Sequence, residues 1–294
     1  MTITQMTYFL EVVKHRGFSK AAEALFVNQS TLSKSIQSLE SEFQVELVDR
    51  NRKSFTLTNE GEVFFQYAQR ICNYYKDQID EMKQRLSSIE RTLRVGIPPT
   101  AGTVYFYPMI QRFRQKYPSV SLRIEEVTSK TVVGMVEDNT LDLGVVLEPF
   151  HNDAYTIQKA YETEVMLVVP RDHRLAKAEN DTVSFSELGN EKFLMISSSY
   201  MFRDIVTAIC KEAGFTPDVV FESAQWDALL EMASGGHGLS FLPYPLLIKA
   251  NLAGVRLLHL TDPAFPWILS LIHKKNKFVF DSMQNFIDMA IEMA

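Results

Sequence analysis

Residues 1–43 contain three segments in which apolar positions recur at the spacing of an α-helix. In residues 2–14, Met6, Phe9, Leu10 and Val13 fall on one side, which predicts a first amphipathic helix. We expect this helix to pack its apolar side beneath the two helices that follow.

Residues 17–39 predict two short helices joined by a tight turn. The apolar positions of this pair are Ala21, Ala22, Leu25, Leu32, Ile36 and Leu39. The small alanines allow the second helix to cross closely, and Val27 fills the corner. Ser19 and Asn28 are the expected N-caps, because Ser and Asn side chains accept backbone N–H bonds at helix starts. The pattern predicts a helix-turn-helix whose second helix runs over residues 29–43.

The outer face of the second helix is polar and has little bulk. Its side chains are Gln29, Ser30, Thr31, Ser33, Lys34 and Gln37. Gln can bond adenine bidentately, Ser adapts to any base edge, and Lys reaches guanine or phosphate. We therefore expect these residues, with Ser19, to contact DNA, the second helix lying in the major groove. The alternative is a three-helix packing unit with a solvated polar face.

Residues 45–58 predict two short strands around a basic turn, the form of a wing. Arg50, Arg52 and Lys53 in the turn could grip phosphates or enter the minor groove. The alternative is a solvated hairpin tip. The adjoining helix-turn-helix favours the role in DNA binding.

Residues 59–91 predict one long helix, since no Pro or Gly interrupts it after Gly61. Its apolar seam, at alternating steps of 3 and 4, is Phe65, Ala68, Cys72, Tyr75, Ile79, Met82, Leu86 and Ile89. Such a narrow heptad seam suits pairing with a second copy of the helix. The sequence therefore predicts a homodimer that presents two recognition helices to a two-fold symmetric DNA site. The alternative is packing on a later domain of the same chain.

From residue 92 onward, short apolar strands alternate with helices. Leu93, Val95 and Ile97 alternate as a strand, and Pro98 ends it. Strand–helix repetition continues to the C-terminus, which predicts mainly parallel sheets with right-handed crossovers. We expect two α/β sets, linked by extended crossings near Tyr161 and Pro266.

The N-terminal patterns resemble the signature of LysR-type transcriptional regulators. The residues that carry the resemblance are Phe18-Ser19-Lys20-Ala21-Ala22, Leu25, Val27, Gln29-Ser30, Leu32-Ser33, Ile36, Leu39-Glu40, Leu47, Arg50 and Leu57-Thr58-Asn59-Glu60-Gly61. The family usually has Pro at the position of Ser30, Gly at that of Gln44 and Phe at that of Val48. The first departure bears on the preferred base sequence. The other two fall at turn and packing positions, so the DNA-binding prediction stands.

The resemblance implies an α + α/β architecture with three parts. These are a winged helix-turn-helix in residues 1–58, a linker and dimerisation helix in 59–91, and a two-lobed α/β domain in 92–294, similar to type 2 periplasmic binding proteins. Lobe I would hold about 92–161 and 267–294, and lobe II about 162–266. The implied partners are double-stranded DNA, a small-molecule effector, further copies in a homotetramer, and RNA polymerase as a candidate.

In sheets of this kind a ligand sits beyond the carboxyl ends of the strands. We expect three loops to converge there and to offer hydroxyl and backbone N–H groups at helix starts, which attract anions. The candidate effector-binding residues are Pro99, Thr100, Ala101, Thr128, Ser129, Ser197, Ser198, Ser199 and Phe202. The expected effector is a small carboxylate or a similar anionic metabolite. The alternative is that the Ser and Thr residues serve only as helix N-caps.

Net charge qualifies the DNA-binding prediction without opposing it. The whole chain carries −6, but residues 1–58 contain seven Lys or Arg and six Asp or Glu, a balance of +1. The acidity therefore belongs to the later part, and phosphate binding needs only a local basic patch.

Composition excludes several other classes. Two cysteines favour a reducing, cytoplasmic compartment, and no apolar run approaches the length of a membrane span. We find no leader, HExxH, CxxC, P-loop or G-x-S-x-G pattern, so no metal, cofactor or catalytic residue is expected. An exported solute-binding protein and an enzyme that uses the cleft remain alternatives, but neither explains residues 1–60.

Overall fold

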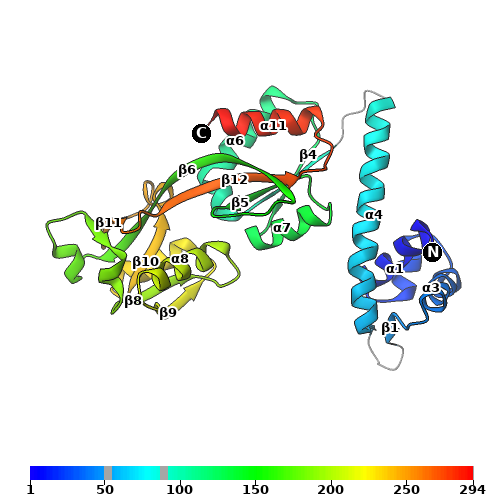
Figure 1. Ribbon diagram of the computed structural model, residues 1–294, viewed down its shortest axis with the longest axis horizontal. Helices are drawn as coiled ribbons and strands as arrows, with labels where there is room; N and C mark the ends of the chain where they lie inside the picture. Colours follow the sequence, from blue (N-terminus) through cyan, green and yellow to red (C-terminus); the bar gives the residue numbers. More distant parts are fainter. Residues whose placement is uncertain (50–54, 87–91, 294) are drawn as a thin grey trace. The chain divides into compact units, whose positions relative to one another are not determined.

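The computed structural model describes residues 1–49, 55–86 and 92–293. The chain forms two compact units, the first built on Met1–Ile89 and the second on nearly all of Glu90–Ala294 (Figure 1). Each unit has its own apolar core. Within the parts of the chain that the structure describes, no helix has the length and apolar character needed to cross a membrane.

Three short helices, a two-stranded hairpin and a long helix make up the first unit. They are α1 (Ile3–Lys14), α2 (Phe18–Ala24), α3 (Gln29–Phe43), β1 (Val48–Asp49), β2 (Thr56–Leu57) and α4 (Asn59–Leu86). A capping box starts α1, where the side chains of Thr2 and Gln5 each accept a backbone N–H from the other residue. The wing strands pair antiparallel, as the sequence predicts.

The core of the first unit holds the apolar positions expected from the sequence. Phe9, Leu32, Ile36 and Leu39 have no exposed surface, and Ala21 is likewise fully buried where α2 and α3 cross. Helices that cross at such small residues approach closely, because no side chain separates their backbones. The packing of these buried side chains therefore fixes the position of α2 relative to α3.

Two backbone sites show why particular residues stand at the joints of this unit. Gln44, which ends α3, has a φ of 55°, in the left-handed region where the resemblance expects Gly. Gly61, in the first turn of α4, has no room for a side chain, since a Cβ would lie 2.0 Å from the carbonyl oxygen of Leu47. Its N–H donates to Thr58 Oγ1 at 2.9 Å, which ties the wing to α4.

Lobe I of the second unit is a sheet flanked by helices. Its elements are β3 (Leu93–Ile97), α5 (Pro99–Ala101), a π-helical turn (Gly102–Phe106), α6 (Tyr107–Lys116), β4 (Leu122–Glu126), α7 (Ser129–Glu137), β5 (Leu143–Leu147), β12 (Pro266–Lys274) and α11 (Asp281–Glu292). Strands β3, β4 and β5 are parallel, and β12 joins β5 antiparallel. The sheet is therefore mixed, where the sequence predicted mainly parallel pairing.

Lobe II repeats this plan with its own strands. Its elements are 3₁₀ turns at Arg174–Lys177 and Phe185–Leu188, β7 (Thr182–Ser184), β8 (Lys192–Ile196), α8 (Met201–Glu212), β9 (Asp218–Ser223), α9 (Trp226–Ser234), β10 (Leu239–Pro243), α10 (Tyr244–Leu247) and β11 (Val255–Thr261). Strand β8 pairs parallel with β9 and β10. This second α/β set confirms the two-lobed architecture.

One long strand, β6 (Tyr155–Pro170), belongs to both lobes (Figure 1). Its first half pairs antiparallel with β12 in lobe I, and its second half pairs with β10 and β11 in lobe II. Tyr161 lies opposite Leu269, and Glu164 lies opposite Pro266. The crossings therefore lie where the sequence placed them, and they form a single pair of antiparallel strands.

Candidate DNA interface and effector cleft

The polar face of α3 is open to solvent. The side chains exposed along it are Gln29, Ser30, Thr31, Lys34 and Gln37, and Ser33 is half-buried. Leu32, Ile36 and Leu39 on the opposite side are fully buried, so packing sets the rotation of the helix. The structure thus presents outward the residues that the sequence assigned to base contacts.

Neither expected N-cap forms a side-chain bond. Helix α2 begins one residue before Ser19, with Gly17 at the N-cap position, and Ser19 is an exposed residue of its first turn. Asn28 does occupy the N-cap position of α3, but its side chain makes no cap bond. The prediction that Ser19 caps α2 is wrong. The N-terminal end of α3 lacks a side-chain cap, as suits a helix that meets phosphate or base edges.

The basic turn of the wing, with Arg50, Arg52 and Lys53, lies outside the described residues. Its base is well defined, since Val48 lies opposite Leu57 and Asp49 opposite Thr56. Glu40 Oε1 near the end of α3 accepts the backbone N–H of Leu47 at 3.0 Å and that of Val48 at 3.3 Å. The wing is therefore anchored to the recognition helix.

Phe26, in the turn between α2 and α3, was not singled out by the sequence. Its side chain is 97% exposed, and its φ of 55° lies in the left-handed region. An exposed aromatic ring in that conformation is unfavourable on both counts. Because this turn leads directly into the recognition helix, Phe26 joins the candidate DNA-contact residues.

The face of α4 that was expected to pair with a second chain is partly used within the first unit. Ala68 is buried, Phe65 is half-buried against the helix-turn-helix core, and Cys72 Sγ lies 3.9 Å from Thr7 Oγ1 in α1. Ile79 is half-buried, whereas Tyr75 and Met82 are exposed. Leu86 ends α4, and Ile89 lies outside the described residues.

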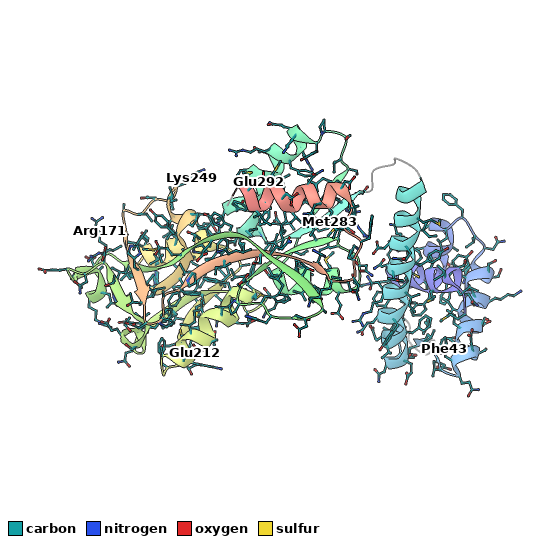
Figure 2. All side chains as sticks on the ribbon, turned by 45° about the horizontal axis from the view of Figure 1, so that its top comes forward. Phe43, Arg171, Glu212, Lys249, Met283 and Glu292 are labelled. Atoms are coloured by element: carbon teal, nitrogen blue, oxygen red, sulfur yellow. The ribbon has the colours of Figure 1, made fainter. Side chains whose placement is uncertain are left out.

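A different apolar row on α4 is open to solvent. Val63, Tyr67, Ile71 and Tyr74 are 56%, 59%, 39% and 60% exposed. The first three also line an apolar groove of about 530 Å³ that continues over Phe43 at the end of α3, a side chain labelled in Figure 2. Steps of four and three residues place this row along one side of the helix.

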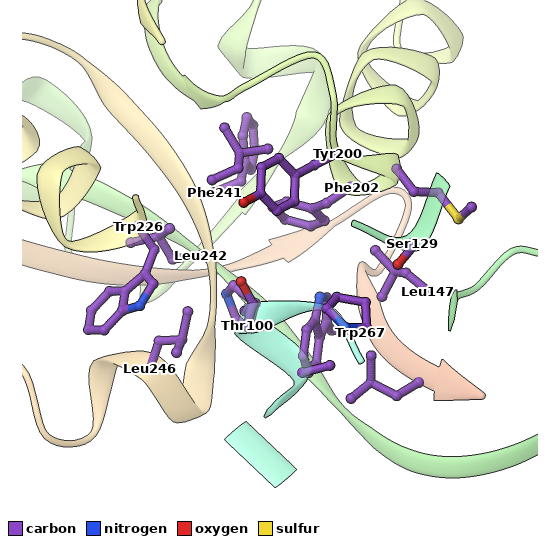
Figure 3. Close-up of a pocket in the computed structure, with 16 residues that line it drawn as sticks. Thr100, Ser129, Leu147, Tyr200, Phe202, Trp226, Phe241, Leu242, Leu246 and Trp267 are labelled. Carbon is purple, nitrogen blue, oxygen red and sulfur yellow. The ribbon is translucent and has the colours of Figure 1, made fainter. Parts of the chain in front are cut away.

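The cleft between the lobes of the second unit is a cavity lined by both of them (Figure 3). Its lining residues are Pro98, Thr100, Ala101, Ser129, Leu147, Ile196, Tyr200, Met201, Phe202, Trp226, Phe241, Leu242, Pro243, Leu246, Trp267 and Leu269. The cavity has a volume of about 50 Å³, and the space that includes its open mouth is about 550 Å³. The cavity is thus a narrow slot.

The structure brings together some of the candidate effector-binding residues and leaves others outside the cavity. Thr100, Ala101, Ser129 and Phe202 line it. The residues outside the lining are Pro99, Thr128, Ser197, Ser198 and Ser199.

Local hydrogen bonds account for two of the candidate residues that lie outside the cavity. Thr128 acts as a cap, since its Oγ1 accepts the N–H of Thr131 at 3.4 Å. Helix α8 starts only at Met201, so Ser197 caps the turn before the helix and accepts the N–H of Ser199. The alternative of simple capping therefore describes these two residues.

Sequence reasoning placed the cleft but missed most of its walls. Leu242, Pro243 and Leu246 come from β10 and α10, and Trp267 and Leu269 come from β12. In the sequence, these segments have the apolar patterns that are typical of ordinary core strands and helices. They could be assigned to the cleft only once the pairing of β6 with β10 and β12 was known.

A charged contact links the lobes beside the cavity. Lys130 Nζ, in α7 of lobe I, donates to the carbonyl oxygen of Ser198 at 2.9 Å and lies 2.7 Å from Asp204 Oδ2 in α8 of lobe II. The two charged side chains are 41% and 59% exposed, so the pair contributes little to stability. It can still bias the relative position of the lobes, because it spans them.

Both thiols of the chain are held in their protonated form. Burial raises the pKa of Cys210 to about 12 and also raises the pKa of Cys72. Since the thiolate is the reactive species, neither thiol is activated for redox chemistry.

A helix-turn-helix with an exposed polar helix, joined to a two-lobed domain with a cleft, is the architecture of a DNA-binding regulator with an effector-binding domain. Residues 3–62 match the family model described as bacterial regulatory helix-turn-helix protein, lysR family. Residues 87–294 match the LysR substrate binding domain. The chain belongs to the LysR family of transcriptional regulators.

Relatives and solved structures agree with this assignment. The chain is 33% identical to the uncharacterized HTH-type transcriptional regulator YwbI of Bacillus subtilis strain 168, over 95% of this chain and 92% of that protein. Its fold matches a full-length OxyR variant from Pseudomonas aeruginosa, with a TM-score of 0.72, 21% identity, and coverage of 100% and 94%. It also matches full-length CbnR complexed with target DNA, with a TM-score of 0.69, 20% identity, and full coverage of both chains.

Proposed function

We propose that this regulator binds a palindrome-like promoter site as a homodimer or a dimer of dimers, and that an effector in the cleft alters its binding. The exposed polar face of α3 over a fully buried apolar face carries this proposal. We place the DNA-binding domain in residues 1–58, the linker helix in 59–91 and the effector domain in 92–294. RNA polymerase is the partner proposed for the bound complex.

The dimer is proposed to form through the exposed row of α4, Val63, Tyr67, Ile71 and Tyr74, with Tyr75 and Met82 further along the helix. Contiguous exposed apolar surface of this kind marks an interface. The adjoining groove over Phe43 extends the surface that a second copy would cover. Ala68 and Cys72 instead hold α4 against α1 of the same chain.

The effector is proposed to carry a carboxylate or a similar anionic group. The hydroxyls of Thr100 and Ser129 line the cavity, and Ser129 is the first residue of the nine-residue helix α7. A helix start of this kind favours a negative group. Binding alters the DNA complex only if the effector has unequal affinity for two arrangements of the lobes or of the dimers.

Replacing Gln29 by Ala tests the recognition helix. We expect specific DNA affinity to fall by about 1–3 kcal/mol and one base preference to be lost, because a bidentate contact disappears. Fluorescence anisotropy with a fragment from upstream of the protein's own gene, against scrambled DNA at fixed salt, measures both. Gln111→Ala, an exposed glutamine in α6 of the second unit, is the matched control. Equal affinity of both variants would contradict the assignment of Gln29.

Replacing Lys130 by Met tests the contact between the lobes. We expect stability to change by less than about 1 kcal/mol, since the pair is exposed. The effector concentration that gives a half-maximal change in DNA binding should shift by about two- to fivefold, because one of the two arrangements of the lobes loses a stabilising contact. Lys249→Met, an exposed lysine beyond α10, is the control. An unchanged effector response would exclude a role for Lys130 in coupling.

A further inference from the structure

Aromatic side chains dominate the walls of the cleft. Five of the sixteen lining residues are aromatic: Tyr200, Phe202, Trp226, Phe241 and Trp267. Both tryptophans of the chain are among them. Figure 3 shows Trp226 and Trp267 on opposite sides of Thr100, with the rings of Tyr200 and Phe202 toward a third edge of the space. Rings therefore surround the space on several sides.

Two of these rings are fixed by stacking behind them. Phe202 stacks on Phe265, with ring centroids 5.7 Å apart and planes inclined by 21°. Phe241 lies between Phe185 and Phe193, at 5.6 Å and 5.5 Å, with nearly parallel planes. Because these contacts hold the rings in place without a ligand, the walls are preorganised and lose little freedom on binding.

The chemistry of the slot has a second constraint, because no charged side chain is among its sixteen described lining residues. Its polar side-chain atoms are the hydroxyls of Thr100, Ser129 and Tyr200 and the indole N–H groups of the tryptophans. A large polar or multiply charged ligand would lose its hydration without a counter-charge in return. A ligand with one small polar group finds neutral partners there, for example the hydroxyls of Thr100 and Ser129.

We infer that the body of the effector is a single planar aromatic ring, held among Trp226, Phe202 and Trp267, with its one polar group at Thr100 and Ser129. This inference rests on the proposed function, in which the effector occupies this cleft. The slot must widen to admit a ring, since an apolar cavity that holds benzene measures about 150 Å³. Offset or edge-on contacts with the fixed rings then favour a flat ring over a saturated body of similar size. The ligand class is thus a small aromatic acid.

The two tryptophans supply a direct assay, because both line the cavity. Titrating the full-length protein with benzoate, cyclohexanecarboxylate, acetate and benzyl alcohol separates the contribution of the ring from that of the acid. Benzoate should change the intrinsic fluorescence at a concentration about three- to tenfold lower than cyclohexanecarboxylate or acetate, as one aromatic contact predicts. The inference of an aromatic effector would be wrong if acetate or cyclohexanecarboxylate bound as tightly as benzoate. It would also be wrong if millimolar benzoate produced no change in fluorescence.

A substitution locates the site. In Trp226→Leu, with Trp267 as the remaining reporter, benzoate affinity should fall by about tenfold. Phe221→Leu, which changes a half-buried core ring outside the lining, should leave it unchanged. Equal affinities in the two variants would place the ring elsewhere and overturn the inference.

The outcomes separate this inference from the proposed function. Benzyl alcohol binding as tightly as benzoate would support the ring while removing the acid from the proposed effector. If the anisotropy experiment showed no specific DNA binding, the proposed function would be wrong, but the fluorescence titrations with benzoate would be unaffected. If the protein kept specific DNA binding but bound acetate and not benzoate, the proposed function would stand and the inference of an aromatic effector would be wrong.

Discussion

Asp142→Asn should lower the free energy of unfolding of the second unit by about 3–5 kcal/mol. Asp142 is fully buried, and its carboxylate accepts from Arg94 Nε and Nη2 at 3.0 Å each and from the Arg94 backbone N–H at 2.9 Å. Lys277 Nζ, on a side chain only 4% exposed, lies 2.9 Å from Oδ1. A neutral amide of the same size would remove the negative charge that both cations contact in this buried cluster.

Urea unfolding of the full-length protein, followed by tryptophan fluorescence, measures this change, since both tryptophans report on the second unit. Glu125→Gln is the control, because Glu125 pairs with an Arg123 side chain that is 71% exposed. That pair should be worth less than about 1 kcal/mol. If the two variants unfolded at the same urea concentration, the buried cluster would not have the stabilising role assigned to it.

The elements that could be predicted from the sequence are those with a regular apolar pattern. Helix α3 runs over Gln29–Phe43, the range predicted from the spacing of its leucines and isoleucine. Helix α7 (Ser129–Glu137) has the same kind of pattern, with Val132 and Val136 buried. In both, one face is buried and the other open, and this contrast sets the period visible in the sequence.

The prediction from the sequence was incomplete where strands from distant parts of the chain pair with one another. The last residues of β6 are continuously buried in lobe II, which makes them a clear apolar run. The first half, from Tyr155 onward, mixes buried and exposed positions in its pairing with β12, and its sequence has no regular strand pattern. The parallel pairings of β3 with β4 and β5, and of β8 with β9 and β10, agree with the prediction. The antiparallel entry of β12 into lobe I was not predicted, because this strand joins the sheet from the end of the chain.

Two site predictions show the limits of local reasoning. Ser19 has the residue type of an N-cap, but Gly17 takes that position because α2 starts earlier. The seam through Ala68 and Cys72 has the correct period for a helix pair, yet its partner is α1 of the same chain. A heptad pattern indicates that one face of a helix is buried, but it does not indicate which segment or chain packs against that face.

Tyr67→Glu should convert the proposed dimer into monomers and weaken binding to a palindromic site by at least about a hundredfold. Tyr67 is 59% exposed in the single chain, so the substitution leaves the core of its own unit intact. In the dimer it would place a charge within the apolar row of α4. Two linked recognition helices gain affinity of about 10²–10⁴-fold over one, and this gain disappears when the chains separate.

Light scattering on a sizing column measures the mass, and anisotropy with full and half sites measures the affinity. Gln66→Glu adds the same charge to an exposed position one residue away, off the row of Val63, Tyr67 and Ile71, and should remain dimeric. Ala68→Leu distinguishes the two faces of α4, because it should disturb packing against α1 and reduce stability while dimers persist in the folded fraction. A dimeric Tyr67→Glu protein with full affinity would place the interface on another surface, and Tyr75 and Met82 would be the next exposed positions to change.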